Sequence, residues 1–350
     1  MAYTTINKST AHFNTKLYTG NNSTNVISGV GFQPDWFWIK DRSTTGEDHH
    51  LFDVVRGLNK ALYSSSTGAE TTGFKGGHNN ITAVGTDGFT ITGSGSNGEG
   101  NLTGRNYASW NWKAGGTASA NTAGTINSTV SVNTTAGFSI VKFTGTGANA
   151  TVGHGLGAVP KMIILKKTNG GADWIVYHNS MGNTKALKLN TTAALSTDTG
   201  YFNSATPTST VFSLGNDGFS NGSNATIIAY CFAEKQGYSK FGSYLGNGNA
   251  DGTFVYTGFK PAFVLIKITS TTNDWEIHDN KRGSSNVINA ILQPNLNVAE
   301  STSGREIDFL SNGFKLRNGS SQNNNSGSTF IYMAFGQSLV GTNNVPCTAR

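Results

Sequence analysis

The sequence predicts an all-β protein made of three tandem antiparallel repeats, each a sandwich or jelly-roll-like unit. Its composition favours strands and turns: Gly, Asn, Ser and Thr are abundant, and charged residues make up only 13% of the chain, about half the ~25% of typical globular domains. Short strand candidates alternate with turn signals, and helical segments of about 10 to 15 residues do not separate them. A loop-strand pattern also recurs three times, which sets the number of repeats.

The recurring pattern is a proline followed by a short apolar run and then a lysine. It reads "GFQPDWFWIK", "GAVPKMIILK" and "GFKPAFVLIK". A proline that feeds several consecutive apolar residues is typical of a loop entering a strand that is buried on both faces. The lysines that end the three runs are Lys40, Lys166 and Lys267.

Other segments align around this pattern. An aromatic residue stands two positions before Gly20, Gly145 and Gly246, and "HHLFDVVRG", "WIVYHNSMG" and "WEIHDNKRG" align without a gap. "GTDGF", "GNDGF" and "LSNGF" each predict a tight Asx-Gly turn before a phenylalanine, at Phe89, Phe219 and Phe314. Each copy closes on an aromatic strand: "YASWNW", "IIAYCF" and "FIYMAF". We therefore predict a triplicated unit.

The repeats are expected at residues 14–113, 136–236 and 238–340. A Gly/Ser/Thr/Asn-rich segment at 114–135 reads as a flexible linker with one strand, "TVSV", and residues 341–350 form a C-terminal tail. Because the second junction is shorter and carries aromatic residues, the second and third repeats should be coupled more rigidly than the first and second. "DVVRGLNKAL" fits a helical turn and an extended strand about equally well.

Charge and cysteine content exclude several functions. The net charge is +6 and the pI is near 9.2, but no basic run concentrates this charge, so nucleic acid is not an expected partner. The two cysteines cannot form a disulfide framework. No secretory signal opens the chain and no run approaches a membrane span. We expect a protein made in a cytoplasm, with no membrane insertion.

Candidate catalytic and metal-binding residues do not recur between the copies. Asp48, His49, His50 and Asp53 are the densest cluster of ligand types, but Trp174 and Trp275 align with His49, so a turn or strand-edge role is favoured over a metal site. His154 stands alone between glycines and is expected to bond to the backbone.

Glu70 and Glu300 recur, but each recurs alone, whereas glycosidic cleavage needs two converging carboxylates. A nucleophile elbow, a P-loop and zinc-spaced Cys or His pairs are missing. The expectation is a protein with no enzymatic activity, no cofactor and no metal.

Four tryptophans could mark a binding surface. Trp36 and Trp38 are spaced two apart, as are Trp110 and Trp112, so each pair faces one side of its strand. If these rings lie on the surface, they would contact glycans. The alternative is core packing, since the aligned residues are Met162, Ile164, Tyr230 and Phe232.

Four segments carry a resemblance to a known family: "GFQPDWFWIKDRS", "HLFDVVRG", "AGFSIVKFTGTGANATVGHGLGAVPKMIILK" and "SYLGNGNADGTFVYTGFKPAFVLIK". From about Asn14 to Val340, the chain resembles a repeated β-rich domain of predicted structural proteins of tailed bacteriophages, especially marine ones. The resemblance implies a virion protein with a concanavalin-like or jelly-roll-like sandwich.

Two functions are consistent with these observations. One is a structural protein on the particle exterior, as a head decoration, fibre or tail appendage. It would be assembled in the host cytoplasm and released by lysis, with other virion proteins and its own copies as partners. The other is a receptor-binding module that recognises host surface glycans.

Overall fold

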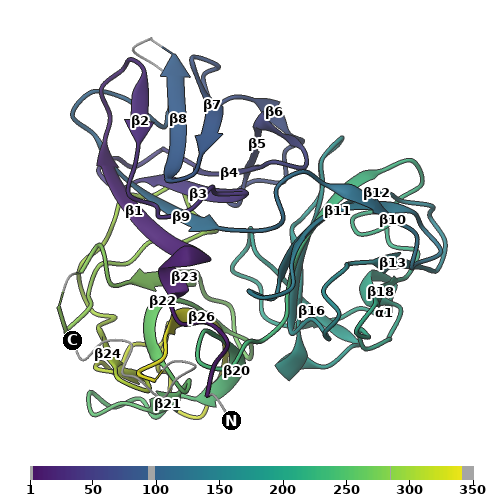
Figure 1. Cartoon of the computed structure of the whole chain (residues 1–350). Helices are drawn as coiled ribbons and strands as arrows, with labels where there is room; N and C mark the ends of the chain where they lie inside the picture. Colours follow the sequence, from purple (N-terminus) through teal and green to yellow (C-terminus); the bar gives the residue numbers. More distant parts are fainter. Residues whose placement is uncertain (1–2, 94–98, 284, 341–350) are drawn as a thin grey trace.

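The computed structural model describes residues 3–93, 99–283 and 285–340, and it confirms the all-β prediction. Strands make up 44% of it and helices 3%, arranged in several antiparallel sheets. Figure 1 shows three β-rich lobes that follow one another along the chain. Within the described part, no helix is long and apolar enough to cross a membrane. The expected C-terminal tail, 341–350, lies outside the described residues.

The first unit is a six-stranded sheet of order β1-β9-β3-β4-β5-β6, beside a smaller sheet of order β2-β8-β7. A 3-10 turn, η1 (Ser9–Ala11), precedes it. The larger sheet consists of β1 (Phe13–Thr19), β3 (Trp36–Asp41), β4 (His49–Asp53), β5 (Gly57–Tyr63), β6 (Thr71–Thr72) and β9 (Asn106–Trp112). The smaller sheet consists of β2 (Asn25–Ile27), β7 (Asn79–Gly85) and β8 (Gly88–Gly93). "DVVRGLNKAL" is therefore a strand end, a turn and a strand, so its extended interpretation holds.

The second unit is an eight-stranded sheet of order β10-β11-β12-β19-β14-β15-β16-β17, beside the pair β13-β18. The strands of the larger sheet are β10 (Ser119–Asn121), β11 (Ser128–Asn133), β12 (Phe138–Thr144), β14 (Met162–Lys167), β15 (Ile175–His178), β16 (Lys185–Lys188), β17 (Ser196–Thr197) and β19 (Thr226–Phe232). The remaining elements are β13 (Ala150–Gly153), η2 (Asn179–Met181), α1 (Thr199–Phe202) and β18 (Val211–Leu214).

The segment expected as a linker, 114–135, contributes β10 and β11 to this sheet. The predicted "TVSV" strand lies within β11, which pairs with β12 along its whole length. Val130 is buried and belongs to the core of the second unit. Its apolar side chain gains from this burial, which fixes the strand in place.

The third unit is a four-stranded sheet of order β20-β26-β22-β23, beside a smaller sheet of order β21-β25-β24. The larger sheet consists of β20 (Ser239–Leu245), β22 (Lys260–Ile268), β23 (Trp275–Asp279) and β26 (Thr329–Gln337). The smaller sheet consists of β21 (Phe254–Tyr256), β24 (Ile307–Leu310) and β25 (Gly313–Leu316).

The strand order of the three larger sheets follows one scheme. In each, the closing aromatic strand lies between the opening strand and the strand after the proline: β1-β9-β3-β4, β12-β19-β14-β15 and β20-β26-β22-β23. The segments "DWFWI", "MIILK" and "FVLIK" thus occupy the same place in the three orders.

Both faces of each larger sheet are covered, which explains the continuous apolar runs. In β3, Phe37 and Ile39 face the local core of the first unit, whereas Trp36 and Trp38 face a second core. This second core contains residues of all three units, among them Trp112, Tyr230 and Phe335. We call it the central core. It makes the three units one packed body.

Hydrogen bonds between units run in a closed cycle around the central core. The backbone N–H of Glu70 donates to Thr168 O at 2.8 Å, joining the first unit to the second. Leu195 N donates to Thr269 O at 2.9 Å, joining the second to the third, and Glu300 N donates to Arg42 O at 3.0 Å, joining the third to the first. The first and second units are therefore in direct contact, as are the second and third, although the sequence led us to expect looser coupling at the first junction.

The two ends of the described fold meet. The backbone N–H of Ser9 donates to Gln337 Oε1 at 2.6 Å, and the Phe13 and Phe335 rings stack with centroids 5.2 Å apart. The last strand of the third unit therefore packs against the first strand of the first unit.

The alignment of Phe219 with Phe89 and Phe314 is wrong. Phe89 and Phe314 are buried and pair with Ile27 and Val255, but Phe219 is 37% exposed. Phe212, which pairs with Val152, takes the buried place in the second unit. The reason is local: β18 ends before "GNDGF", where Asp217 Oδ1 accepts a hydrogen bond from Phe219 N at 2.7 Å and makes a loop.

Candidate functional site

The four tryptophans considered for glycan contact are all buried. Trp36, Trp38, Trp110 and Trp112 are 0% exposed and belong to the central core. The Trp36 ring stacks on Tyr230 of the second unit with centroids 4.5 Å apart. A ring enclosed on both faces cannot stack on a sugar in solution, so these residues hold the units together.

The four polar residues around "DHH" do not converge. In β4, His49 and Asp53 point toward the central core side, and His50 points into the first unit, because side chains alternate along a strand. His49 Nδ1 accepts a hydrogen bond from Trp38 Nε1 at 2.9 Å, and burial holds the pKa of His49 well below its usual range. Among the described residues, no group of three or more His, Cys, Asp or Glu side chains could hold a metal ion.

His154 is buried beside β13 and bonded to the backbone, as expected. Its Nδ1 accepts from Leu156 N at 3.2 Å, and its Nε2 lies 3.2 Å from Thr208 O. Burial lowers the pKa of His154. The imidazole is therefore a neutral structural group at the end of a strand.

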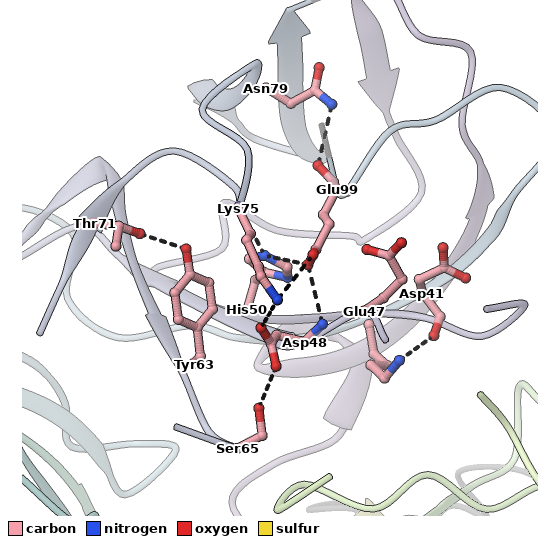
Figure 2. A network of polar contacts seen from close by, with 12 residues as sticks. Asp41, Glu47, Asp48, His50, Tyr63, Ser65, Thr71, Lys75, Asn79 and Glu99 are labelled. Carbon is pink, nitrogen blue, oxygen red and sulfur yellow. Dashed lines mark hydrogen bonds and ion pairs between the residues drawn. The ribbon is translucent and has the colours of Figure 1, made fainter. Parts of the chain in front are cut away.

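A network of charged side chains lies at the edge of the first unit (Figure 2). Glu99 Oε2 lies 3.2 Å from His50 Nε2, and Lys75 Nζ lies 2.8 Å from Asp48 Oδ2. Ser65 Oγ donates to Asp48 Oδ1 at 2.8 Å. A hollow of about 390 Å³ adjoins the network, lined in part by Asp48, Tyr63, Thr71, Phe74 and Lys75.

The carboxylates of this network are neutralised in place. Arg105 contacts both Asp41 and Glu47. Burial raises the pKa of Glu47, and the neighbouring Glu99 carboxylate adds to this, while Arg105 opposes it. Burial would also raise the pKa of Glu99, but His50 and Lys75 hold it below its usual value.

The geometry of Glu47 and Glu99 does not fit glycoside cleavage. A glycosidase holds its two carboxyl groups about 5 to 10 Å apart on either side of the scissile bond. Glu47 and Glu99 instead act on each other as neighbouring carboxylates, and each contacts a basic side chain. Both carboxylates are thus engaged by basic partners, and the network joins the loop after β3 to the rest of the unit.

Glu70 and Glu300 take part in two similar chains of ion pairs. Arg282 Nε lies 2.6 Å from Asp279 Oδ2, and its NH1 lies 3.0 Å from Glu300 Oε2. In the first unit, Arg56 Nε lies 2.5 Å from Asp53 Oδ2, and its NH1 lies 3.5 Å from Glu70 Oε2. Both recurring glutamates thus neutralise an arginine.

Each of these pairs reaches the next unit of the cycle. Trp110 Nε1 of the first unit donates to Asp279 Oδ2 at 2.9 Å, and Tyr230 OH of the second unit donates to Asp53 Oδ2 at 2.8 Å. In the second unit, His178 stands in the aligned place, with its Nε2 3.2 Å from Tyr332 O of the third. Sequence reasoning missed the arginines, although "DVVRG" and "DNKRG" show the same Asp-to-Arg spacing.

The three aligned lysines are also buried, and two of them bond across a unit boundary. Lys166 Nζ donates to Thr67 O of the first unit at 2.8 Å, and Lys267 Nζ donates to Thr192 O of the second at 3.0 Å. Lys40 Nζ donates to Asp41 O at 2.7 Å. Burial lowers the pKa of each of these lysines to about 8.

An asparagine fixes the loop before each closing strand, and sequence reasoning missed it. Asn324 Nδ2 donates to Asn318 O at 2.7 Å and to Asn249 O at 2.9 Å. Asn101 and Asn221 make similar bonds across their own loops. A Cβ at Gly20, Gly145 or Gly246 would overlap the backbone beside these asparagines, which explains the recurring glycine. Each asparagine stands five residues before its closing strand, and that spacing was the available signal.

Among the described residues, two exposed aromatic side chains lie together on the outer face of the sheet β21-β25-β24. Val255, Phe314 and Phe309 point inward and are buried, so the alternate residues point outward. Phe254 and Tyr256 are 44% and 59% exposed. Across the ladder, Phe254 lies beside Lys315, and Tyr256 lies beside Gly313.

The chain belongs to the family described as Domain of unknown function (DUF7483), whose model matches residues 8–338. No curated protein and no solved structure shows significant similarity to the chain. The family match spans all three units and both junctions, so the three lobes belong together as one family domain.

Proposed function

We propose that the protein is a non-enzymatic structural component of a tailed bacteriophage particle, displayed on the exterior as a head decoration, fibre or tail appendage. The resemblance of the four quoted sequence segments to phage structural proteins supports this class. We further propose that it acts as a homo-oligomer in contact with other virion proteins, and that it is assembled in the host cytoplasm and released by lysis.

The fold that we propose for this role is a triplicated sandwich of jelly-roll-like or concanavalin-like type. The common order of the four main strands supports the triplication. So does the placement of the small sheets, where the pairs β2-β8, β13-β18 and β21-β25 hold Phe89, Phe212 and Phe314 at corresponding positions.

One observation carries the structural role: the recurring chemical groups are used to hold the units together. Two of the three aligned lysines bond across a unit boundary, the two Asp-Arg-Glu chains each reach the next unit, and all six tryptophans belong to the central core. A charge that is buried and paired in this way is costly to disturb. It is therefore better suited to maintaining shape than to turnover.

The location on the particle can be tested directly. Particles of a phage that encodes this chain would be purified by density gradient, treated with protease or left intact, and analysed by mass spectrometry and cryo-electron microscopy. We expect the chain in stoichiometric amounts, with density on the exterior. Its absence from purified particles would overturn the structural role.

Multivalent attachment follows from display in many copies. Linking weak sites raises their effective concentration, and avidity can rise by about 10²-fold or more. Retention of the free chain on host cells and on protein-stripped virions would be compared with that of an oligomerised form. Equal retention would argue against avidity, and release of reducing sugars that depended on Glu70 or Glu300 would overturn the non-enzymatic assignment.

A second candidate function is recognition of host surface glycans. The specific observation that favours it is the exposed pair Phe254 and Tyr256 on the outer face of the third unit. This function is compatible with the first, because an exterior virion protein can also bind the host.

A further inference from the structure

We propose that the outer face of β21-β25-β24 is a carbohydrate-binding site that stacks an uncharged pyranose ring on Phe254 and Tyr256. This inference rests on the second candidate function above and names its site. We call the surface formed by Phe254, Tyr256, Gly313 and Lys315 the aromatic face.

The backbone of the aromatic face presents both rings to solvent. Phe254 and Tyr256 are two residues apart on one strand, so they share a face at a spacing of about 7 Å. A Cβ built at Gly313 would lie 2.9 to 3.0 Å from two atoms of the Phe254 ring. The ring therefore leans over the glycine, with its other side open, and the glycine leaves the floor between the two rings flat.

The second ring is held at its far end. Tyr3 OH donates to Gly258 O at 2.8 Å, and the Tyr256 hydroxyl lies at the same glycine, since a Cβ built at Gly258 would lie 2.6 Å from the Tyr3 hydroxyl oxygen and 3.5 Å from that of Tyr256. Packing of its hydroxyl end beside Gly258 restricts Tyr256, while the residue stays 59% exposed. A ring that is already oriented loses less entropy when a ligand binds.

The polar groups beside the rings match a sugar rather than an apolar partner. Lys315 Nζ pairs with Asp251 Oδ1 at 2.7 Å, and Arg317 Nε lies 3.3 Å from Asp308 Oδ2. Lys315 lies between Phe254 and Asp308 on adjacent strands and pairs with each of them across the sheet. Hydrogen-bond donors and acceptors thus lie beside the aromatic rings on the same sheet. A pyranose offers C–H groups to the electron-rich ring faces and hydroxyl groups to these neighbours.

The charges on this face are balanced, with two basic and two acidic side chains in two pairs. A strongly anionic glycan would gain little from such a surface, which favours an uncharged one. A second copy of the chain or another protein would need a more continuous apolar surface, because the fully buried core of such an interface is depleted of charged residues.

The corresponding faces of the other two units lack these features. Cross-strand pairing places Val26 where Phe254 stands, and Val26 has no aromatic neighbour on its strand. In the second unit, Thr151 and Gly153 take the corresponding positions, and the segment 121–125 covers them: Thr125 N donates to Thr151 Oγ1 at 3.0 Å. We therefore infer one site per chain, on the third unit.

The test measures glycan binding by the isolated full-length chain. An array of uncharged oligosaccharides would be screened first, with maltohexaose, cellohexaose and chitohexaose as solution probes in saturation-transfer NMR and calorimetry. We expect binding at one site per chain. Phe254→Ala combined with Tyr256→Ala should weaken it by about ten-fold or more.

Three further variants separate stacking from general apolar contact. The double substitution Phe254→Leu and Tyr256→Leu keeps apolar area but removes the rings, and should weaken binding as much as the alanine pair. Phe254→Trp should retain binding. Val26→Ala, at the corresponding exposed position of the first unit, should leave it unchanged, and near-UV circular dichroism would confirm the folding of every variant.

Several outcomes would overturn the site. These are no binding to any member of the array or solution probes, full binding by the leucine pair, or dimers in sedimentation velocity that the alanine pair dissolves while no glycan binds. The last result would make the face a contact between copies. Because the assay needs no particle, its failure leaves the location of the chain in the virion to be decided by the particle analysis.

Discussion

At the scale of single residues, the aromatic side chains divide into buried and presented groups. Trp275 is 1% exposed, and its Nε1 donates to Lys188 O of the second unit at 3.0 Å. Trp174 does the same toward Tyr63 O of the first unit. The indole thus fills the central core and bonds to a neighbouring unit, whereas Phe254 and Tyr256 face solvent.

Truncating Trp275 should therefore be costly. Both Trp275 and Phe314 are buried. We expect Trp275→Ala to lower the free energy of unfolding by about 3 to 5 kcal/mol, the usual range for large aromatic core deletions, as measured by urea denaturation. Phe254→Ala is the matched control and should cost less than about 1 kcal/mol. Similar losses of stability for both variants would contradict the assignment of Trp275 to the core and of Phe254 to the surface.

At the scale of elements, the ends of β4 and β23 hold the buried ion pairs. Asp279 is the last residue of β23 and accepts hydrogen bonds from the backbone N–H of Lys281 and Arg282, both at 2.9 Å. Burial would raise the pKa of Asp279, but Arg282 holds it below its usual value. The second unit has His178 and Met181 at the aligned positions, and burial lowers the pKa of His178 to about 4. The fold therefore accommodates uncharged side chains at these two positions.

Removing Arg282 alone should lower the free energy of unfolding more than replacing both Arg282 and Asp279. Arg282→Met leaves the Asp279 charge buried without its partner, and should destabilise the chain by about 3 to 5 kcal/mol in urea denaturation. Adding Asp279→Asn should recover part of that loss, since the amide keeps the acceptor for Trp110 Nε1. Lys281→Met, on an exposed neighbour, is the control. A double variant as unstable as the sum of the singles would show that the pair is not coupled.

The buried lysines at the ends of the post-proline strands predict a pH dependence. Their folded pKa of about 8 lies below the 10.5 of an ordinary lysine, so between these values the unfolded chain binds more protons than the folded chain. Stability should therefore rise from pH 8 to pH 10, by up to about 1.4 kcal/mol per pH unit for each lysine. Above that window the buried tyrosines, whose pKa values are raised, act in the opposite direction.

The measurement is the urea midpoint at pH 8, 9 and 10 for the native chain and for Lys166→Met. The variant loses two contacts to carbonyl groups, so its stability should be lower at every pH. The informative quantity is the slope with pH, which should fall by about a third when one of three lysines is removed. An unchanged slope would show that these lysines do not titrate in this range.

At the scale of the whole molecule, the central core should make the three units unfold together. Each unit presents one face of its larger sheet to this core, and the hydrogen bonds between units close a cycle. A single unit in isolation would expose residues such as Ile164, Tyr230 and Phe232. We therefore expect one calorimetric transition for the full chain, with a van't Hoff enthalpy close to the calorimetric one.

A fragment provides the second part of this test. Residues 114–236, expressed alone, should aggregate or form oligomers through the exposed face, as shown by light scattering. Two or three separate transitions in the full chain, or a monomeric folded fragment, would contradict the shared core.

A structural feature can be predicted from the sequence when it depends on residues that are close together in the chain. Apolar runs, Asx-Gly turns and the recurring Pro-to-Lys spacing predict strands and their repetition, because these signals depend on neighbouring residues. The central core could not be predicted, since nothing in β3 alone tells which units its Trp36 and Trp38 will meet. For the same reason, Trp110 looked like a surface candidate although it bonds to Asp279, 169 residues away.

The second unit shows a further limit. Equal wording around "GNDGF" suggested an equivalent phenylalanine, but pairing with β13 selects Phe212, which lies before that turn. The aromatic face was missed because "FVY" also fits a core strand. Only the covering of one side of the sheet distinguishes Val255 from its two neighbours.

The meeting of Ser9 with Gln337 has a consequence for how the gene could be rearranged. Since the fold's two ends lie in hydrogen-bond contact and the units contact one another in a cycle, the order in which the units are translated is not dictated by their packing. A circular permutant that joins these ends with a short polar linker and opens the chain at residues 234–237, between β19 and β20, should reach the same structure. The third unit would then be synthesised first. Native-like chemical shifts for the Trp275 and Trp174 indole N–H groups would show that the central core had formed.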